Sequence, residues 1–430
     1  MIKKLLSKFN SKKFKVGVIG LGYVGLPICE RFSRAGIEVI GVDNDSYKIK
    51  ILKKGLSYIK TNKLKKFKYF KKNKKNLSTN YKILSKCDAI LICLPTPLKN
   101  SKPDMSYIFD CARKLRKILT PFQLLVLEST VYPGATDELI NIVKQKKIIL
   151  GKNFFVGYSP ERENPGDKNF SYKKTPKIIS GFSRNCLILM DALYKHIIHK
   201  RVKSDDLKSA ELSKLLENLY RSVNIGLINE LKIICDYLKI DIFKVIDLAS
   251  TKNFGFQKFL PGPGLGGHCI PIDPYYLSWI SKKKGYQPKF IPLAGKINTS
   301  MPLWVVKKML NKQKNQKQNI LILGVAYKKN VDDDRESPSF EFMKILRKKN
   351  IYFDFVDPYF IKIRKGRKIS IEKKSIKLNI RNSKNYDCAI IVTDHDKFNY
   401  NFIKKNFRYI FDTRGVFLRK KIMSKNIIQV

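Results

Sequence analysis

Apolar residues along the first 160 positions fall into short runs separated by stretches with helical spacing. Lys15–Ile19 is such a run, Leu26–Ala35 has the spacing of a helix that Gly36 stops, and Glu38–Val42 is the next run. Further runs follow at Ala89–Leu94, Leu124–Leu127 and Phe154–Tyr158. Short apolar strands that alternate with helices are typical of a parallel sheet covered on both faces. The pattern therefore predicts a doubly wound, Rossmann-like α/β domain.

A second α/β region follows a long helical pattern. Asp205 to about Lys239 contains no proline, and its apolar residues recur at three- and four-residue steps. This pattern is longer than an ordinary globular helix, so we interpret it as a spine that joins two domains and packs against a second subunit. Strands are expected again at Asn319–Val325, Ile351–Val356, Cys388–Thr393 and Tyr409–Phe411. The predicted architecture is two Rossmann-like doubly wound domains joined by a long central helix with a small helical middle domain, with bounds at 14–203, 204–300 and 301–430.

Charge and cysteine usage narrow the function classes. The formal net charge of +52 comes mostly from lysine spread along the whole chain, whereas nucleic-acid and membrane sites concentrate charge locally. None of the eight cysteines forms a Cys-x-x-Cys pair, which favours reduced thiols, and the four histidines show no metal-binding spacing. No apolar run has membrane-spanning length, and Met1–Lys13 does not have the apolar core of a signal peptide. We expect a soluble, cytoplasmic protein without a metal, a nucleic-acid partner or a membrane partner.

A glycine-rich turn joins the first strand to the first helix. Gly20, Gly22 and Gly25 form the G-x-G-x-x-G pattern in this strand–turn–helix context. Such glycines permit a tight turn, the approach of a pyrophosphate and close helix–strand contact. Asp43, at the end of the second strand, suits a ribose 2′-hydroxyl and would repel a 2′-phosphate. These features predict an NAD site and disfavour NADP.

Polar residues follow three of the predicted strands. Thr96, Thr130 and Glu161 each stand just beyond a strand end. Because ligands of parallel sheets gather at the carboxyl ends of the strands, we expect these three residues near the glycine turn. The simpler alternatives are a helix cap for Thr130 and a surface acid for Glu161.

One loop in the middle of the chain is crowded with glycine and proline. It runs from Phe259 to Trp279, and Cys269 lies just ahead of Asp273-Pro274, which has the pattern of an N-cap followed by a first-turn proline. Amide hydrogens and the dipole at a helix N-terminus favour thiolate over thiol. We therefore predict that Cys269 is a covalent nucleophile. The alternative is a buried small hydrophobe, the usual state of a cysteine.

Two polar residues interrupt the apolar stretches of the long helical pattern. Lys214 and Asn218 are four residues apart and share one helix face. A lysine that extends to solvent beside an exposed amide is the alternative interpretation. In the second α/β region Lys328 and Arg335 lie beyond a strand end, and no second G-x-G-x-x-G occurs. That region is expected to bind something other than a dinucleotide.

The motifs taken together resemble the UDP-glucose/GDP-mannose dehydrogenase family. The resemblance runs from about Lys15 to about Val416 and rests on VGVIGLGYVGLP, LPTP, ESTVYPGAT, SPERENPGD, AELSKLLENLYRSVNIGLINE, GPGLGGHCIPIDP, GVAYKKNVDDDRESPS and DTRG. It implies NAD-dependent oxidation of the C6 alcohol of a nucleotide sugar to a carboxylate. It also implies a role for each predicted region. The first binds NAD, the second forms the dimer and carries the catalytic lysine and cysteine, and the third binds the UDP-sugar.

The resemblance implies residue roles. For catalysis it implies Cys269 as the thiol nucleophile, Lys214 and Asn218 as oxyanion stabilisers, Asp273 holding Lys214 and the hydrolytic water, and Thr130 and Glu161 positioning that water. For NAD it implies Gly20, Gly22, Tyr23, Val24, Gly25, Asp43, Lys48, Thr96, Thr130 and Arg335. For the UDP-sugar it implies Glu161, Arg162, Lys214, Asn218, Phe259, Gly262, Gly266, Lys328 at the diphosphate, and Arg414.

Two segments bear on the sugar. SPERENPGD and GHCIPIDPYYLSW look most like the branch that oxidises UDP-N-acetylglucosamine or UDP-N-acetylgalactosamine, since Pro165 and Ile272 stand near positions where UDP-glucose enzymes tend to carry an acid and a lysine. The expectation is a UDP-N-acetylglucosamine 6-dehydrogenase for surface polysaccharide synthesis, with UDP-glucose and UDP-N-acetylgalactosamine as alternative substrates. A single-step dehydrogenase of the 6-phosphogluconate or hydroxyacyl type and a basic, nucleotide-regulated binding protein are the rival function classes.

Overall fold

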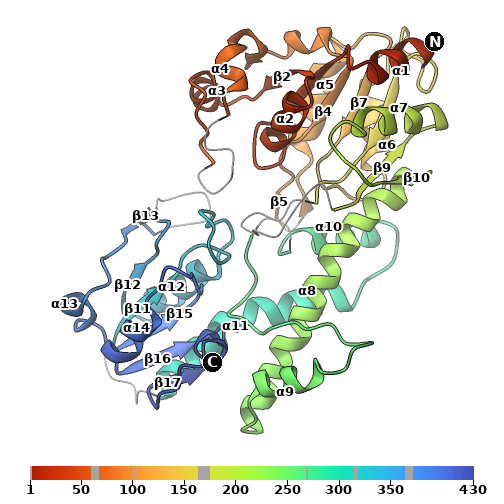
Figure 1. Ribbon diagram of the computed structural model, residues 1–430. Helices are drawn as coiled ribbons and strands as arrows, with labels where there is room; N and C mark the ends of the chain where they lie inside the picture. Colours follow the sequence, from red (N-terminus) through yellow and green to blue (C-terminus); the bar gives the residue numbers. More distant parts are fainter. Residues whose placement is uncertain are drawn as a thin grey trace. The chain divides into compact units, whose positions relative to one another are not determined.

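The computed structural model describes residues 2–59, 67–100, 102–162, 175–267, 270–312, 318–363 and 371–430. The chain divides into two compact units (Figure 1). Unit 1 comprises Met1–Glu217 and Tyr275–Tyr286, and unit 2 comprises Asn218–Pro274 and Gln287–Val430. His268 and Cys269 lie outside the described residues.

Unit 1 is built on a sheet of eight strands within its described residues, in the order β10-β9-β8-β7-β4-β1-β2-β3. The strands are β1 (Lys15–Ile19), β2 (Glu38–Val42), β3 (Leu77–Ser78), β4 (Ala89–Ile92), β7 (Leu124–Leu127), β8 (Phe155–Tyr158), β9 (Lys177–Gly181) and β10 (Arg201–Ser204). Neighbouring strands are parallel except β8 and β9. Every residue of the central strands β4 and β7 is buried, so both faces of the sheet are covered.

The helices of unit 1 alternate with these strands. They are α1 (Ile2–Asn10), α2 (Gly25–Arg34), α3 (Ser46–Lys53), α4 (Tyr69–Lys72), α5 (Ser106–Arg116), α6 (Ala135–Val143) and α7 (Arg184–Tyr194). Two short 3₁₀ helices (Lys74–Asn76 and Tyr81–Lys86) and a two-residue hairpin of β5 (Leu98–Lys99) and β6 (Lys102–Pro103) complete the unit. The predicted α/β fold is confirmed here. β1, β2 and β7 have the predicted bounds, whereas β4 ends two residues early, just ahead of the segment with Pro95, which has no N–H to donate to a neighbouring strand.

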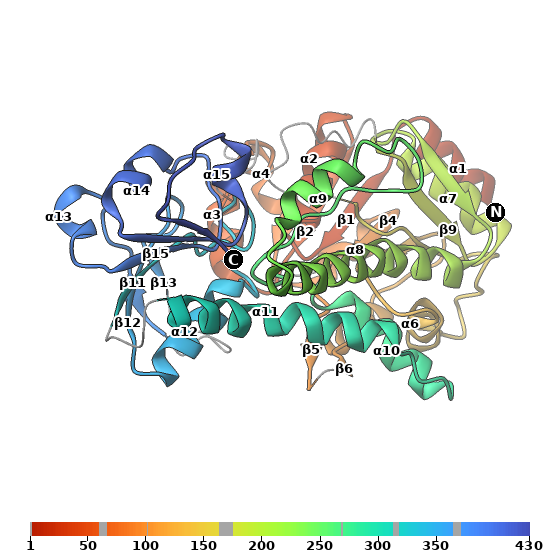
Figure 2. The ribbon, with the colours of Figure 1, turned by 90° about the horizontal axis from the view of Figure 1, so that it is seen from below.

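Helix α8 (Leu207–Tyr237) is the predicted long helix, and the boundary between the units falls within it. It begins two residues later than predicted because the Asp206 carboxylate accepts hydrogen bonds from Lys208 N (3.2 Å) and Ser209 N (2.6 Å), as an N-cap does. It ends two residues before the predicted Lys239, which has a φ of 58°. In unit 2, helix α11 (Phe290–Lys312) runs along α8, with Ala294 packed against Gly226 (Figure 2).

Unit 2 contains a parallel sheet of five strands among its described residues, in the order β12-β11-β15-β16-β17. The strands are β11 (Asn319–Leu323), β12 (Tyr352–Val356), β15 (Cys388–Ile391), β16 (Tyr409–Asp412) and β17 (Ile427–Gln429), with a small hairpin of β13 (Lys362–Ile363) and β14 (Lys373–Lys374). The remaining described helices of unit 2 are α9 (Ile242–Ala249), α12 (Pro338–Lys348), α13 (Ile380–Ser383), α14 (Tyr400–Asn406) and α15 (Val416–Arg419). Helix α10 (Asp273–Lys283) begins in unit 2 and belongs to unit 1 from Tyr275 on. This is the second Rossmann-like sheet that the sequence predicts.

One predicted cap differs from the structure. Asp273 is the first residue of α10 and not a residue ahead of it. Its carboxylate accepts a hydrogen bond from the Asn218 side chain, so it pairs with a side chain as well as standing at a helix start. Ser337, by contrast, stands ahead of α12 and caps it, because its hydroxyl accepts a hydrogen bond from Ser339 N.

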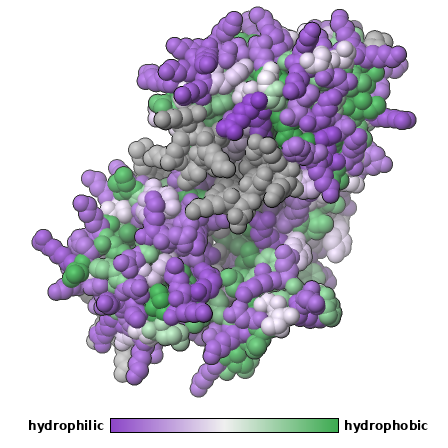
Figure 3. Space-filling model, in the orientation of Figure 1, coloured by the Kyte–Doolittle hydropathy of each residue, from purple (hydrophilic) through white to green (hydrophobic). Residues whose placement is uncertain are grey.

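The surface and the helices give two further facts. On the face drawn in Figure 3, hydrophilic residues are spread over both units and do not gather into one patch. None of the described helices combines the length and the apolar character that a membrane crossing requires.

Candidate active site

The glycine turn of unit 1 is shaped by close packing at two of its three glycines. Gly20 has a φ of 87°, and a Cβ there would lie 2.5 Å from the Cys93 carbonyl oxygen. A Cβ on Gly25, the first residue of α2, would collide with the Gly20 carbonyl oxygen. A Cβ on Gly22 would meet nothing within 4 Å. The turn is therefore closed on the protein side and open at Gly22, which leaves room for a pyrophosphate at the N-terminus of α2.

Asp43 lies at the end of β2, beside this turn, and is buried. Its Oδ2 accepts a hydrogen bond from Leu21 N (2.9 Å), and its Oδ1 accepts one from Asp45 N (3.0 Å). The Lys48 ammonium lies 3.1 Å from Oδ2 and stays partly exposed. A fixed carboxylate at this position can accept hydrogen bonds from a ribose diol. Tyr23 and Val24 lie between the open glycine and α2, so the predicted NAD residues of the glycine turn adjoin one another along the chain.

Two of the polar residues at the sheet edge are joined directly. The Thr96 hydroxyl donates to the Thr130 carbonyl oxygen at 2.9 Å, because β4 and β7 are neighbours in the sheet. Tyr276, from the α10 segment of unit 1, donates to the Thr96 carbonyl oxygen at 2.6 Å. These two hydrogen bonds hold the backbone at Thr96 and Thr130 in place. The Thr130 side chain is half-buried.

Glu161 follows β8 at the same edge, and its side chain is 12 % exposed. Its Oε1 accepts a hydrogen bond from Arg162 N (3.0 Å), and its Oε2 lies 3.5 Å from the Lys177 ammonium. Burial opposes ionisation of this carboxyl, but the positive charges of Lys177, Arg31 and Lys214 outweigh burial and hold its pKa below the usual value. Glu161 is thus a buried carboxylate, and the surface-acid alternative is wrong.

Arg162 and Lys214 complete the predicted residues of unit 1. Arg162 forms an ion pair with Glu217 and donates from Nη1 to the Pro176 carbonyl oxygen at 2.8 Å. Lys214 lies on α8 and is 9 % exposed, so the alternative of a lysine that extends to solvent does not hold. Its charge acts on Glu161.

Asn218 and Asp273 form a buried, hydrogen-bonded polar pair in unit 2. The Asn218 side-chain amide donates to Asp273 Oδ2 at 2.5 Å, and both residues are buried, at 4 % and 3 % exposed. This bond ties α8 to the first residue of α10, four positions after Cys269. The exposed-amide alternative for Asn218 is therefore wrong.

The glycine loop of unit 2 is anchored at several points. Gly262 N donates to the Asn229 side-chain oxygen at 2.9 Å, and a Cβ on Gly262 would lie 2.8 Å from Arg414 Nη1. A Cβ on Gly266 would meet Tyr327 and Pro338 within 3 Å. These glycines let the loop lie directly against the strand-end segments of the second sheet.

The remaining predicted residues of unit 2 belong to those segments. The Phe259 ring packs edge-on against Tyr220, with ring centroids 5.9 Å apart. Arg335 pairs with Asp333 through Nε (2.9 Å) and Nη2 (2.7 Å), and its carbonyl oxygen accepts from Gly267 N. Arg414 donates from Nε to the Val392 carbonyl oxygen at 2.8 Å. Lys328 is half-buried in the turn after β11.

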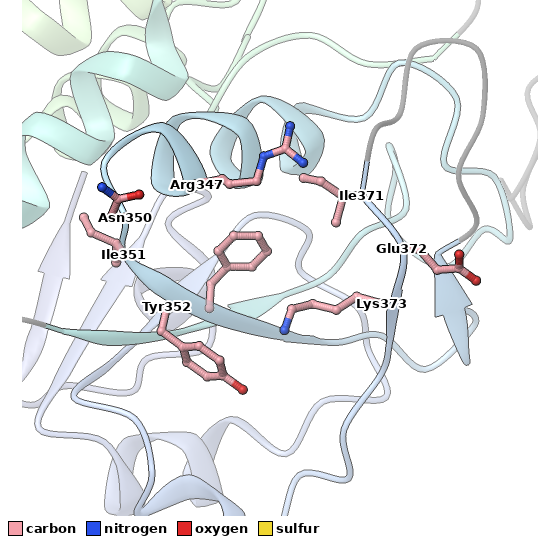
Figure 4. Close-up of a pocket in the computed structure, with 8 residues that line it drawn as sticks. Arg347, Asn350, Ile351, Tyr352, Ile371, Glu372 and Lys373 are labelled. Carbon is pink, nitrogen blue, oxygen red and sulfur yellow. The ribbon is translucent and has the colours of Figure 1, made fainter.

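Sequence reasoning missed several buried polar residues in the two units that carry the predicted site residues. Lys177 and Glu128 stand behind Glu161, Glu211 accepts three hydrogen bonds at the start of α6, and Asn229 holds Gly262. A charged residue at the head of an otherwise apolar segment, as in Lys177-Ile-Ile, was the available signal. An open cavity of about 560 Å³ beside β12 contains none of the predicted residues (Figure 4). Its lining residues are Arg347, Asn350, Ile351, Tyr352, Phe353, Ile371, Glu372 and Lys373.

Three family models match this chain in succession. Residues 14–198 match the NAD binding domain of the UDP-glucose/GDP-mannose dehydrogenase family, residues 208–300 its central domain and residues 321–419 its UDP binding domain. The chain belongs to this family. It is thus an oxidoreductase of the nucleotide-sugar dehydrogenases with NAD as its cofactor, and the sequence prediction of both is confirmed.

Relatives with several substrates in their names cover nearly the whole chain. The UDP-N-acetyl-D-mannosamine dehydrogenase of Methanococcus vannielii is 33% identical over 91% of this chain and 89% of its own length. The UDP-N-acetyl-D-glucosamine 6-dehydrogenase of Salmonella typhi is 34% identical over 91% of this chain and 92% of its own length. The solved UDP-D-ManNAc dehydrogenase of Pyrococcus horikoshii is 28% identical, with a TM-score of 0.84 over 96% of this chain and 98% of that one.

Proposed function

We propose that the protein is a UDP-N-acetylhexosamine 6-dehydrogenase that oxidises the C6 alcohol of UDP-N-acetylglucosamine to the carboxylate in two steps. The observation that carries the proposal is the buried hydrogen bond from Asn218 to Asp273, four residues after Cys269. A carboxylate that is bonded to an amide donor and follows a cysteine by four positions in the sequence suits acyl chemistry on a thiol, which an enzyme that stops at the aldehyde does not need.

The overall reaction consumes one water and two NAD⁺. The alcohol R–CH₂OH, two NAD⁺ and water give R–COO⁻, two NADH and three protons. Bound NAD⁺ supplies the hydride acceptor for both oxidations. After the first oxidation the Cys269 thiolate adds to the aldehyde carbon and forms a thiohemiacetal, which is again an alcohol that can lose a hydride. The second oxidation leaves a thioester, and water cleaves it to release the acid and the Cys269 thiolate.

Side chains of the protein have separate roles in these steps. Lys214 and Asn218 donate hydrogen bonds to the oxyanions of the thiohemiacetal and thioester stages. Asp273 keeps the Asn218 amide oriented and takes part in holding the water. Glu161 and Thr130 position the water that attacks the thioester. Fixed donors of this kind contribute about 3–4 kcal/mol each to a transition state when they are aimed at the developing charge.

The remaining predicted residues bind the two ligands. Gly20, Gly22, Tyr23, Val24 and Gly25 surround the NAD pyrophosphate, and Asp43 with Lys48 takes the ribose. Thr96 and Arg335 complete the cofactor contacts. On the substrate side the proposed contacts are Arg162, Phe259, Gly262, Gly266, Lys328 at the diphosphate and Arg414.

UDP-N-acetylglucosamine is the substrate we favour. The proposal is supported by relatives from Pseudomonas aeruginosa and Salmonella typhi that carry this substrate in their names, each 34% identical. UDP-N-acetylmannosamine is the second candidate, since the Methanococcus vannielii relative is 33% identical and the Pyrococcus horikoshii structure has a TM-score of 0.84. A cytoplasmic location, a role in surface polysaccharide synthesis and a homodimer built on the α8 region accompany the proposal.

Cys269→Ser tests the covalent step. With UDP-N-acetylglucosamine and NAD⁺, this variant is expected to form no uronic acid, as measured by mass spectrometry of the nucleotide sugar. Cys235→Ala is the matched control, because Cys235 is a buried thiol of α8 outside the proposed chemistry, and it is expected to form the acid. Normal acid formation by Cys269→Ser would contradict the mechanism.

A further inference from the structure

A buried row of charges stands behind Glu161 in unit 1. The Lys177 ammonium lies 2.7 Å from Glu128 Oε2 and 3.5 Å from Glu161 Oε2, and it donates to the Pro160 carbonyl oxygen at 3.2 Å. The three side chains are only 0–12 % exposed. They come from three neighbouring strands, because Glu128 follows β7, Glu161 follows β8 and Lys177 begins β9.

The far end of this row is fixed more firmly than the near end. Tyr194 of α7 donates its hydroxyl hydrogen to Glu128 Oε1, so both oxygens of Glu128 are bonded. The Lys177 ammonium also lies 5.3 Å from the centre of the Tyr194 ring. At the near end, no described residue donates a hydrogen bond to Glu161 Oε2. That oxygen is held by the charge of Lys177 alone among the described ion pairs.

Stability alone gives no reason for this arrangement. The rest of β9 is buried, so an apolar residue at position 177 would suit the strand. Replacing a buried ion pair with apolar residues is often neutral or stabilising, because the charges lose their hydration. A buried lysine between two carboxylates, one of them in the proposed catalytic set, therefore points to a function.

The charges that face Glu161 come from every element packed around it. They are Lys177 of β9, Arg31 of α2 and Lys214 of α8, with Glu128 beyond Lys177. Arg162 contributes its backbone N–H, and the Cys93 thiol lies just after β4. Burial opposes ionisation, but Lys177 is the largest of the charges that lower the pKa of Glu161. Burial likewise raises the pKa of Glu128, which Lys177 and Tyr194 oppose.

We propose that Lys177 is a positioning residue that keeps Glu161 as an oriented carboxylate, while Glu128 and Tyr194 hold Lys177 in place. This rests on the proposed function of Glu161 in thioester hydrolysis. A carboxylate orients the attacking water by accepting a hydrogen bond, whereas a protonated carboxyl presents a donor in its place. Lys177 thereby acts on the hydrolysis step and does not touch the substrate.

Lys177→Met removes the charge at similar length, and kcat for NADH formation is then measured from about pH 4 to 9, a range that reaches the usual pKa of a glutamate. Without its nearest cation Glu161 binds a proton more readily, so the acid limb of the profile is expected to move up by about one pH unit or more. Activity should therefore fall most at the acid end of this range, while at pH 7 and above Glu161 stays ionised and activity approaches that of the wild type. Lys203→Met, which alters an exposed lysine of the neighbouring β10, should leave the profile unchanged.

Glu128→Gln is the second variant. It removes a negative charge beyond Lys177, so the acid limb is expected to stay or move to lower pH. Opposite behaviour of the two variants supports the proposal. A Lys177→Met profile that keeps its shape and is only scaled down would overturn it, and so would an upward shift in Glu128→Gln.

A readout without turnover separates this inference from the proposed function. The Glu161 carboxyl carbon is followed by ¹³C NMR in glutamate-labelled protein, with Glu161→Gln identifying the signal. Its titration midpoint should rise by about one unit or more in Lys177→Met, whatever the substrate proves to be. An unchanged midpoint would overturn the role of Lys177. Absence of NADH from every UDP-sugar, with a shifted midpoint, would contradict only the proposed function.

Discussion

Asn229 is predicted to hold the glycine loop that leads to Cys269. Its side-chain oxygen accepts from Gly262 N at 2.9 Å, and its amide donates to the Asn298 side-chain oxygen at 2.8 Å. Asn298 in turn donates to the Ser222 carbonyl oxygen at 3.0 Å. Asn229 and Asn298 are 0 % and 1 % exposed, so water does not replace a lost partner.

Asn229→Ala removes both hydrogen bonds and leaves two buried polar groups unpaired. Each such group costs about 1–3 kcal/mol, so the free energy of unfolding should fall by about 2–6 kcal/mol. For a unit of this size, about 2–4 °C of melting temperature is lost per kcal/mol. Because the orphaned Gly262 N–H lies in the loop itself, uronic acid formation should fall more steeply than NAD binding.

Denaturant unfolding and hydrogen exchange at the Gly262 amide measure these effects. Asn224→Ala is the matched control, since Asn224 lies on the same helix and donates to the Tyr220 carbonyl oxygen one turn away. It should change stability by less than about 0.5 kcal/mol. The reasoning is refuted if Asn229→Ala unfolds like the control and the Gly262 amide exchanges at the wild-type rate.

Three further predictions concern unit 1. Asp43→Asn should raise the KM for NAD⁺ about tenfold or more, because it weakens one charge-assisted hydrogen bond. It should also reduce the preference for NAD⁺ over NADP⁺. An unchanged ratio of kcat/KM for the two cofactors would count against the ribose contact. Gly22→Ala should fold normally yet bind NAD at least about tenfold more weakly, as measured by calorimetry, since its Cβ meets no protein atom within 4 Å and occupies the phosphate's place. Burial raises the pKa of Glu211 to about 7 despite its hydrogen bonds from Gly134 and Thr136. Its contribution to stability is full below the unfolded pKa and is lost as pH rises to about 7. The free energy of unfolding of Glu211→Gln, measured relative to that of the wild type, should therefore rise by about 3 kcal/mol between pH 4.5 and 8. A difference that does not vary with pH would contradict this.

Local patterns predicted most of the first sheet because its strands are short and wholly apolar. β9 (KIISG) was not predicted, because its apolar run is only two residues long, and helix α11 was missed because Pro302 interrupts the pattern of a helix. Strands β4, β11 and β15 each end two residues before their predicted ends, because an apolar run can continue past the last residue that pairs in the sheet.

The candidate site also contains residues that the sequence pattern predicts and residues that it does not predict. Residues in motifs of adjacent positions, such as Gly22 and Asp43, were found from the sequence because their spacing follows from one strand–turn–helix unit. Lys177 and Glu128 are 49 positions apart and meet only because β7, β8 and β9 are neighbours in the folded sheet. Such pairs depend on the order of the strands, and the sequence pattern does not state that order.

The most direct test of the central claim is the yield of NADH per sugar consumed. Wild-type protein is incubated with NAD⁺ and, separately, limiting UDP-N-acetylglucosamine, UDP-N-acetylmannosamine, UDP-N-acetylgalactosamine and UDP-glucose. The account predicts two NADH per UDP-N-acetylglucosamine, with slower turnover of the others. Two NADH from UDP-N-acetylmannosamine with none from UDP-N-acetylglucosamine would keep the chemistry and replace the substrate. One NADH per sugar, with the aldehyde as product, would contradict the covalent double oxidation.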